Sequence, residues 1–210
     1  MKLGSRLDRG QFRPRPLVGA IEQIDAYSRI VGAPLVKGNN DRWGDCVETA
    51  AYNAIQDDMA DIGDLGALHD DLPVHLYSQL TGFDPATGAN DNGTDPLSLI
   101  KFWQGNSISG WRLASVTHID PSREGDIRHS IATKGGIYLV VNLSVDQQNQ
   151  QTWMPTGQPG SWGEHAVWCD SFDGATYFVT SWGLRIAVDR SFITNRNFVV
   201  GAFSLDLVRA

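Results

Sequence analysis

The chain has 210 residues, of which 41% are hydrophobic and 20% charged, with a formal net charge of −7. This length and composition suit one compact domain, or one domain divided into two lobes. The acidic balance argues against general binding to nucleic acid or to an anionic membrane surface. No run approaches the ~20 apolar residues of a membrane span, and the first residues lack the apolar core of a secretory signal. We therefore expect no membrane partner and no specific nucleic-acid partner.

The sequence contains two cysteines and five histidines. Cys46 and Cys169 lie far apart, so they predict neither a disulfide framework nor a metal-type pair, and a reducing compartment is the default. His69 lies among several aspartates, which favours a solvated acidic loop over a cation site because known cation loops space their ligands more regularly. We expect no metal and no cofactor.

Residues 1–20 are expected to form an extended basic arm, since they carry five basic residues, one acidic residue and two prolines. Such an arm is either a solvated tail or a docking segment for an acidic protein partner. The next stretch, 21–31, has apolar residues at helical spacing and predicts a short helix that ends at Gly32.

Residues 46–56 give the clearest helix signal in the chain. Apolar residues at positions 47, 50, 51, 54 and 55 follow the spacing of a buried helix face. Asp45 is a natural N-cap, and Glu48, three residues later, completes a variant of the capping box.

The remaining elements divide the chain into a helical and a strand-rich half. Residues 56–71 are expected to be loop with short helix, 73–80 and 96–103 to be helices, and 83–94 to be rich in turns. The segments 137–143, 166–169, 176–180 and 198–203 have β-type composition. This segregation predicts an α+β protein in which one domain, 21–210, has a helical lobe over about 21–110 and a β lobe over about 111–210.

Cys46 is the candidate nucleophile. At the first turn of a helix, unpaired N–H groups and the helix dipole favour the reactive thiolate. Gly44 lets the backbone turn tightly into the helix, and the Cys46 N–H and the Asn40 amide are candidate donors to an oxyanion. His165 starts a later strand after a glycine-rich loop, where it is expected to face the thiol as its base. Cys169, four residues further, is better explained as a buried core thiol.

These pieces, in this order, resemble the papain family of cysteine peptidases. The family combines a Gly-x-Cys turn that opens a central helix, a His-Ala-Val strand and an Asn-Ser-Trp-Gly segment about fifteen residues later. The resemblance covers most of residues 37–190 and implies a two-lobed fold, with the Cys46 helix leading the helical lobe and His165 on an antiparallel sheet or barrel. It implies peptide or amide hydrolysis and assigns site residues: Cys46 as nucleophile, His165 as base, Asn40 at the oxyanion position, Thr180 at the position that orients the histidine, and Gly44, Asp45, Gly93, Glu164 and Trp182 along the substrate cleft.

Two positions depart from the family pattern: Asn40 replaces a glutamine and Thr180 replaces the orienting asparagine. A threonine hydroxyl can still accept the imidazole N–H, whereas Asp170 is expected to face away from His165. The motifs look closer to a divergent branch associated with tailed bacteriophages and prophages, which implies a cytoplasmic or virion-associated protein. Because of Thr180, the basic arm and the short stretch before Cys46, an inactive virion or assembly component stays an alternative, and so does a peptidoglycan amidase.

Overall fold

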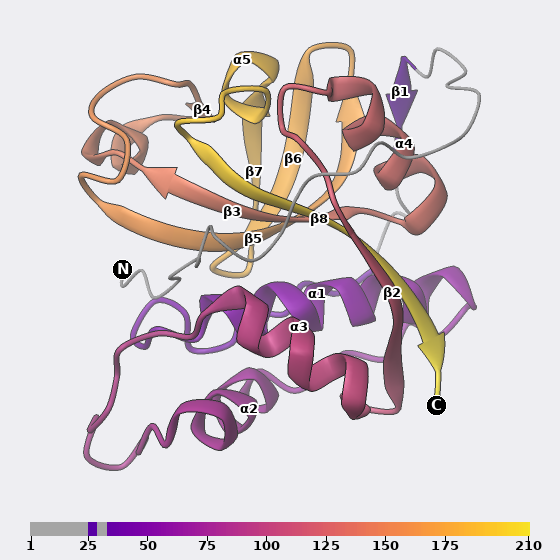
Figure 1. The fold of residues 1–210 in the computed structure, drawn as a ribbon, viewed down its shortest axis with the longest axis vertical. Helices are drawn as coiled ribbons and strands as arrows, with labels where there is room; N and C mark the ends of the chain where they lie inside the picture. The colour runs from indigo at the N-terminus through magenta and orange to yellow at the C-terminus, as the bar shows by residue number, and fades with distance from the viewer. Residues whose placement is uncertain (1–24, 29–32) are drawn as a thin grey trace.

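The computed structural model describes residues 25–28 and 33–210. Three helices come early in the chain and pack together as a layer on one side of the molecule (Figure 1): α1 (Cys46–Asp61), α2 (Asp71–Thr81) and α3 (Pro96–Gly105). The later helical elements are α4 (Glu124–Lys134), a 3-10 turn (Val145–Asn149) and α5 (Arg190–Ile193). None of the helices in the described part of the chain is both long and apolar enough to cross a membrane.

The strands form one mixed sheet across the other side of α1 (Figure 1). They are β1 (Ala26–Tyr27), β2 (Trp111–His118), β3 (Ile137–Leu143), β4 (Thr152–Trp153), β5 (Gly163–Asp173), β6 (Thr176–Ser181), β7 (Leu184–Asp189) and β8 (Val199–Arg209). Their order is β2-β8-β3-β5-β6-β7-β4, with β1 paired to β5. Every pairing is antiparallel except that of β4 with β7. The α+β class expected from the sequence is confirmed.

Helix α1 is the centre of the packing between the helices and the sheet. Its predicted apolar face, from Val47 to Ile55, is buried, and the small alanines at 50, 51 and 54 let the helix approach the sheet closely. The polar side chains of Asn53 and Gln56 are buried as well, and each hydrogen-bonds to backbone groups of neighbouring loops. These two side chains therefore keep hydrogen-bond partners although the helix around them is largely buried.

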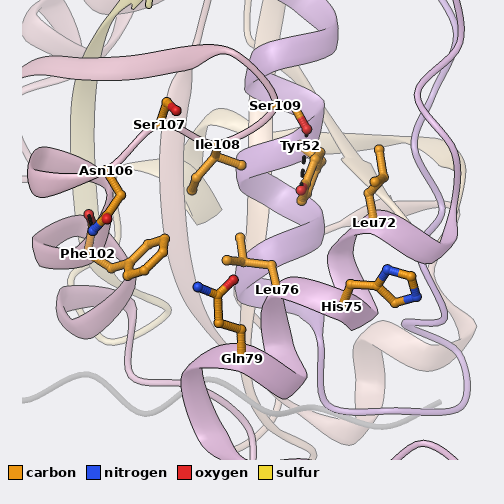
Figure 2. Close-up of a pocket in the computed structure, with 10 residues that line it drawn as sticks. All are labelled: Tyr52, Leu72, His75, Leu76, Gln79, Phe102, Asn106, Ser107, Ile108 and Ser109. Carbon is orange, nitrogen blue, oxygen red and sulfur yellow. Dashed lines mark hydrogen bonds between the residues drawn. The ribbon is translucent and has the colours of Figure 1, made fainter.

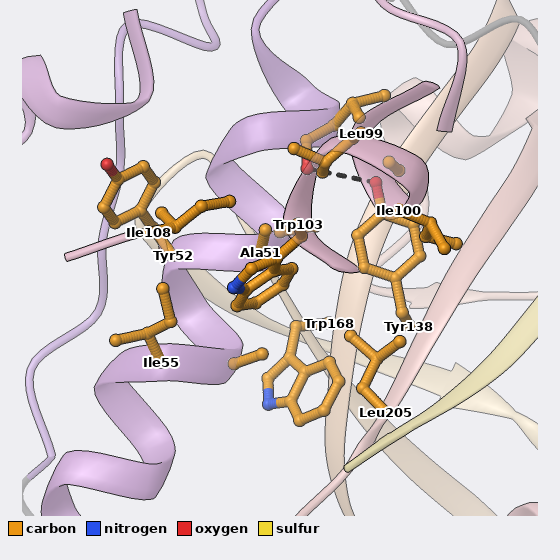
Figure 3. Packing of buried hydrophobic residues seen from close by; sticks show 14 of the residues in the cluster. Ala51, Tyr52, Ile55, Leu99, Ile100, Trp103, Ile108, Tyr138, Trp168 and Leu205 are labelled. Carbon is orange, nitrogen blue, oxygen red and sulfur yellow. Dashed lines mark hydrogen bonds between the residues drawn. The ribbon is translucent and has the colours of Figure 1, made fainter. Parts of the chain in front are cut away.

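The central strands contribute to two separate cores because side chains alternate along a strand. Tyr138 and Val140 of β3 join the cluster around α1 and α3 that Figure 3 shows, whereas Ile137, Leu139 and Val141 join the cluster beneath α4 and α5. Both faces of this part of the sheet are therefore buried, which explains the nearly continuous apolar run of β3 in the sequence.

Several boundaries differ from the sequence expectation. The helix expected over 21–31 falls mostly outside the described residues, and Ala26–Tyr27, which are described, instead form a strand against Phe172 and Asp173 of β5. Helix α1 continues to Asp61, into the stretch expected to be mainly loop, and α2 begins two residues before Pro73. The strand-rich half also contains a helix that was not predicted, α4.

Candidate active site

Cys46 is the first residue of α1 and has no exposed surface. The helix packs against β5, the strand that carries His165, and Cys46 shares a buried cluster with Ala166, the residue that follows His165. The hydroxyl of Tyr138 on β3 donates to the carbonyl oxygen of Val47 at 3.0 Å, which fixes the first turn of α1 to the sheet. The first turn of α1 is thus attached to β3, and the helix as a whole packs on the strand that carries His165.

Asp45 holds the loop before Cys46 together and does not cap helix α1 as expected. Asp45 occupies the N-cap position, but its carboxylate accepts a hydrogen bond from the Asn39 N–H at 3.0 Å and caps no backbone N–H of the helix. Burial, with a smaller contribution from the nearby Asp91, raises the pKa of Asp45 to about 7. Asn40, on the same loop, is buried, and its side-chain Oδ1 has no hydrogen-bond partner. An unpaired acceptor at this depth is uncommon and leaves the Asn40 Oδ1 open to a hydrogen-bond donor.

Glu48 does not complete the expected capping box. Its Oε1 instead accepts a hydrogen bond from the Thr94 hydroxyl at 2.6 Å, and both side chains are buried. Burial, with a smaller contribution from Asp45, raises the pKa of Glu48 to about 8. The reason for the difference is that α1 starts inside the molecule, where Glu48 faces another segment rather than its own helix end.

His165 is held by two neighbours near the start of β5. Its Nε2 lies 2.6 Å from the Ser181 Oγ, and its ring stacks on Trp182 with centroids 4.6 Å apart and planes 11° apart. Trp182 in turn stacks on Trp162, at 5.5 Å. The other ring nitrogen, Nδ1, is buried without a hydrogen-bond partner. Burial also lowers the pKa of His165 to about 3, which keeps the resting imidazole neutral.

The residue that contacts the imidazole is Ser181, one residue after Thr180. Thr180 lies inside β6, opposite Trp168 of β5 and Arg185 of β7, whereas Ser181 is the last residue of that strand. Successive side chains on a strand point to opposite faces, so only one of the two can meet the ring. Ser181 was not predicted from the sequence because Thr180, and not Ser181, stands at the position of the family's orienting asparagine.

The segment around Gly93 packs directly on the turn before Cys46. A Cβ atom on Gly44 would lie 3.2 Å from the Gly93 nitrogen and 3.0 Å from the Asp91 Oδ1. Glu164, half-buried on β5, pairs with Asn142 of β3, next to His165. Cys169 is a buried free thiol in the second core, as expected, and Asp170 forms an ion pair with Arg185 at 2.9 Å.

A pocket of about 360 Å³ lies elsewhere, among the three early helices and the loop 106–109 (Figure 2). Leu72, Leu76, Phe102 and Ile108 supply its apolar lining, and neutral polar groups such as Gln79 and Ser109 complete it. None of the site residues expected from the sequence lines this pocket.

Comparison with known proteins finds solved structures of similar fold but no match in sequence. No protein-family model matches the sequence, and no curated protein matches it. Among solved structures, xylellain, a cysteine protease from Xylella fastidiosa, superposes with a TM-score of 0.75 at 14% identity, over 99% of this chain and 96% of that one. Procathepsin L 3 from the larval midgut of Tenebrio molitor gives 0.68 at 11% identity, over 92% and 73%. Bromelain from Ananas comosus, in complex with the E64 inhibitor, gives 0.59 at 15% identity, over 83% and 94%. The α1 helix that begins at Cys46 and the sheet that carries His165 are therefore the two halves of a papain-like cysteine protease fold.

Proposed function

We propose that this protein is a cysteine hydrolase that cleaves peptide or amide bonds. The observation that carries the proposal is the state of His165: one ring nitrogen is engaged by Ser181, the ring is stacked on Trp182, and the second nitrogen is free of partners. This oriented base lies on the strand against which the Cys46 helix packs. The similarity in fold to cysteine proteases supports the same reading.

The mechanism follows from the neutral imidazole. In the tautomer whose Nε2–H donates to Ser181, Nδ1 carries the lone pair that takes the proton from the Cys46 thiol. The thiolate attacks the substrate carbonyl carbon, and the oxyanion is held by the Cys46 N–H and the Asn40 amide. The protonated His165 gives its proton to the leaving amine as the C–N bond breaks. Water then releases the acyl group from the sulfur.

The proposed cleft uses the remaining predicted residues. Gly44, Asp45 and Gly93 form one wall beside the nucleophile, whereas Glu164 and Trp182 flank the histidine. A peptide is the default substrate because the similar structures are proteases. A peptidoglycan cross-link is an alternative amide substrate, because its cleavage uses the same thiol chemistry.

The first test is alkylation of Cys46 by iodoacetamide as a function of pH, followed by mass spectrometry. We expect Cys46 to react at least about tenfold faster in the wild type than in His165→Ala near pH 7, because the variant lacks the base. Cys169 is the internal control, since burial raises the pKa of its thiol and the second core encloses it. Equal rates at Cys46 in the two proteins, with the fold intact, would contradict the proposal.

The Ser181 contact gives a second prediction. Ser181→Ala leaves the imidazole without its Nε2 partner, so the ring and its tautomer are no longer fixed. We expect a fall of about tenfold in the alkylation rate of Cys46 near pH 7. Thr180→Val is the matched control, because it removes the hydroxyl of the neighbouring residue and is expected to change the rate less than about twofold. A larger loss from Thr180→Val than from Ser181→Ala would return the orienting role to Thr180.

One observation favours a second candidate, a virion or assembly component that keeps the fold without turnover. Both Cys46 and His165 have no exposed surface, and an active site that substrate cannot reach serves no catalysis. Robust turnover of peptides by the isolated protein would exclude this candidate. A basic arm over 1–20 that binds protein partners, and a lobe boundary near residue 110, stay predictions from the sequence.

A further inference from the structure

The segment from Asp91 to Thr94 is fastened to the start of α1 at both of its ends. At the first end, the Asp91 Oδ1 accepts hydrogen bonds from the Gly44 N–H at 2.9 Å and from the Tyr77 hydroxyl at 3.0 Å. The same hydroxyl accepts the Gly93 N–H at 2.8 Å. One carboxylate and one phenol therefore connect the segment, helix α2 and the turn that leads into Cys46.

At the second end, the Thr94 hydroxyl donates to Glu48 at 2.6 Å. Glu48 is fully buried and Thr94 is 3% exposed, so water does not compete for this bond. Glu48 is two residues after Cys46, in the first turn of α1. A displacement of Thr94 would leave the second oxygen of the Glu48 carboxyl group unpaired as well, because the Oε2 already has no partner.

Between the two ends, the backbones touch. The Gly93 nitrogen and Cα would lie 3.2 and 3.3 Å from a Cβ on Gly44, which is tighter than ordinary van der Waals contact. Position 44 must lack a side chain for the segment to lie where it does. The Gly93 N–H is already used by Tyr77, so the hydrogen bond serves to hold the segment in place.

We propose that Asp91 and Thr94 are positioning residues that clamp this segment against the nucleophile turn, so that an extended peptide substrate meets a fixed wall beside Cys46. The proposal rests on the proposed function, and it adds a role for residues outside the proposed catalytic set. Substrate alignment is worth more than its few hydrogen bonds suggest, because a small displacement of a bound peptide moves its carbonyl away from the thiolate.

The test compares two reagents that attack the same sulfur. A peptidyl epoxide must lie along the cleft to react, whereas iodoacetamide needs no cleft. We expect Thr94→Val, which replaces the hydroxyl by a methyl group of similar size, to lower the ratio of the peptidyl rate to the iodoacetamide rate by about tenfold. Thr94→Ser keeps the hydroxyl and is expected to restore the ratio to within about twofold. Asp91→Ala, which breaks the other end, is expected to lower it as well.

Asp57→Asn is the matched control, because this residue is a buried carboxylate on the same helix, bonded to the indole of Trp168 far from the segment. Its ratio is expected to equal that of the wild type. An unchanged ratio in Thr94→Val, or an equal fall of both rates, would overturn the positioning role while Cys46 reactivity in the wild type still upheld the proposed function. If iodoacetamide alkylates Cys46 no faster in the wild type than in His165→Ala, the proposed function fails, and the positioning role fails with it.

Discussion

Replacing Glu48 by glutamine is expected to remove the part of the stability loss between about pH 5 and about pH 9 that comes from ionisation of Glu48. Burial raises the pKa of Glu48 from 4.5 to about 8, so the folded protein holds a proton that the unfolded chain releases between these values. The stabilisation is therefore complete below about pH 4.5 and is lost as the pH rises through about 8. This difference in pKa corresponds to roughly 5 kcal/mol at most.

The measurement is the free energy of unfolding by urea at several pH values, in the wild type and in Glu48→Gln. His165 acts in the opposite direction: its pKa falls from 6.5 to about 3, so its contribution is lost as the pH falls. The difference in free energy of unfolding between Glu48→Gln and the wild type removes the contribution of His165, because His165 is present in both proteins. Asp84→Asn is the control, because hydrogen bonds from Thr87 and Ala86 lower the pKa of this exposed carboxyl and keep it ionised throughout. Parallel curves for wild type and Glu48→Gln would show that Glu48 is solvated.

Replacing Gly136 by alanine is expected to destabilise the fold by about 3 kcal/mol. A Cβ at this position would lie far inside contact distance of the Trp168 indole and 2.9 Å from the carbonyl oxygen of Cys169. The indole is fully buried, and its Nε1–H donates to Asp57 on α1, so it cannot move aside without breaking the contact between helix and sheet. Position 136 must be a glycine because any side chain there would overlap the Trp168 indole at the start of β3.

Thermal unfolding tests this prediction, with a fall in Tm of roughly 6–12 °C expected for a chain of this size. Gly105→Ala is the matched control, because no atom lies within 4 Å of a Cβ there and the residue ends helix α3. We expect its Tm to stay close to that of the wild type. If the two alanine variants unfold at the same temperature, Trp168 is packed less tightly than the structure indicates.

The best-predicted elements are those whose burial leaves a clear apolar pattern in the sequence, either on one face of a helix or along a whole buried strand. Helix α1 was predicted because its apolar face repeats at helical spacing, and β3 was predicted with the bounds it has in the structure because an apolar run of that length is typical of a buried strand. Helix α4 was missed because it buries Asp126 and Ser130 together with two isoleucines, which hides the apolar pattern. The pairing of Ala26–Tyr27 depends on β5, almost 150 residues away, and no local signal contains it.

The candidate site shows the same division between local and distant information. Cys46 at a helix start and His165 on a strand are local features, and both were placed on the expected elements. The partner of His165 depends on which of two adjacent side chains at the end of β6 turns toward the ring, which only the pairing of β5 with β6 decides. Likewise, the bond of Glu48 to Thr94 joins residues 46 positions apart, so capping rules that consider one helix alone assigned Glu48 to the wrong partner.

The complete burial of Cys46 and His165 has a kinetic consequence. If the enclosed arrangement is the resting state, every turnover begins with an opening step, and the observed rate at saturating substrate includes that step together with acyl transfer. Reaction with a small thiol reagent then reaches a plateau as the reagent concentration rises, since the opening rate sets the ceiling. A substitution that loosens the enclosure raises this plateau without altering the chemistry of the sulfur, so access and reactivity become separable quantities in this protein.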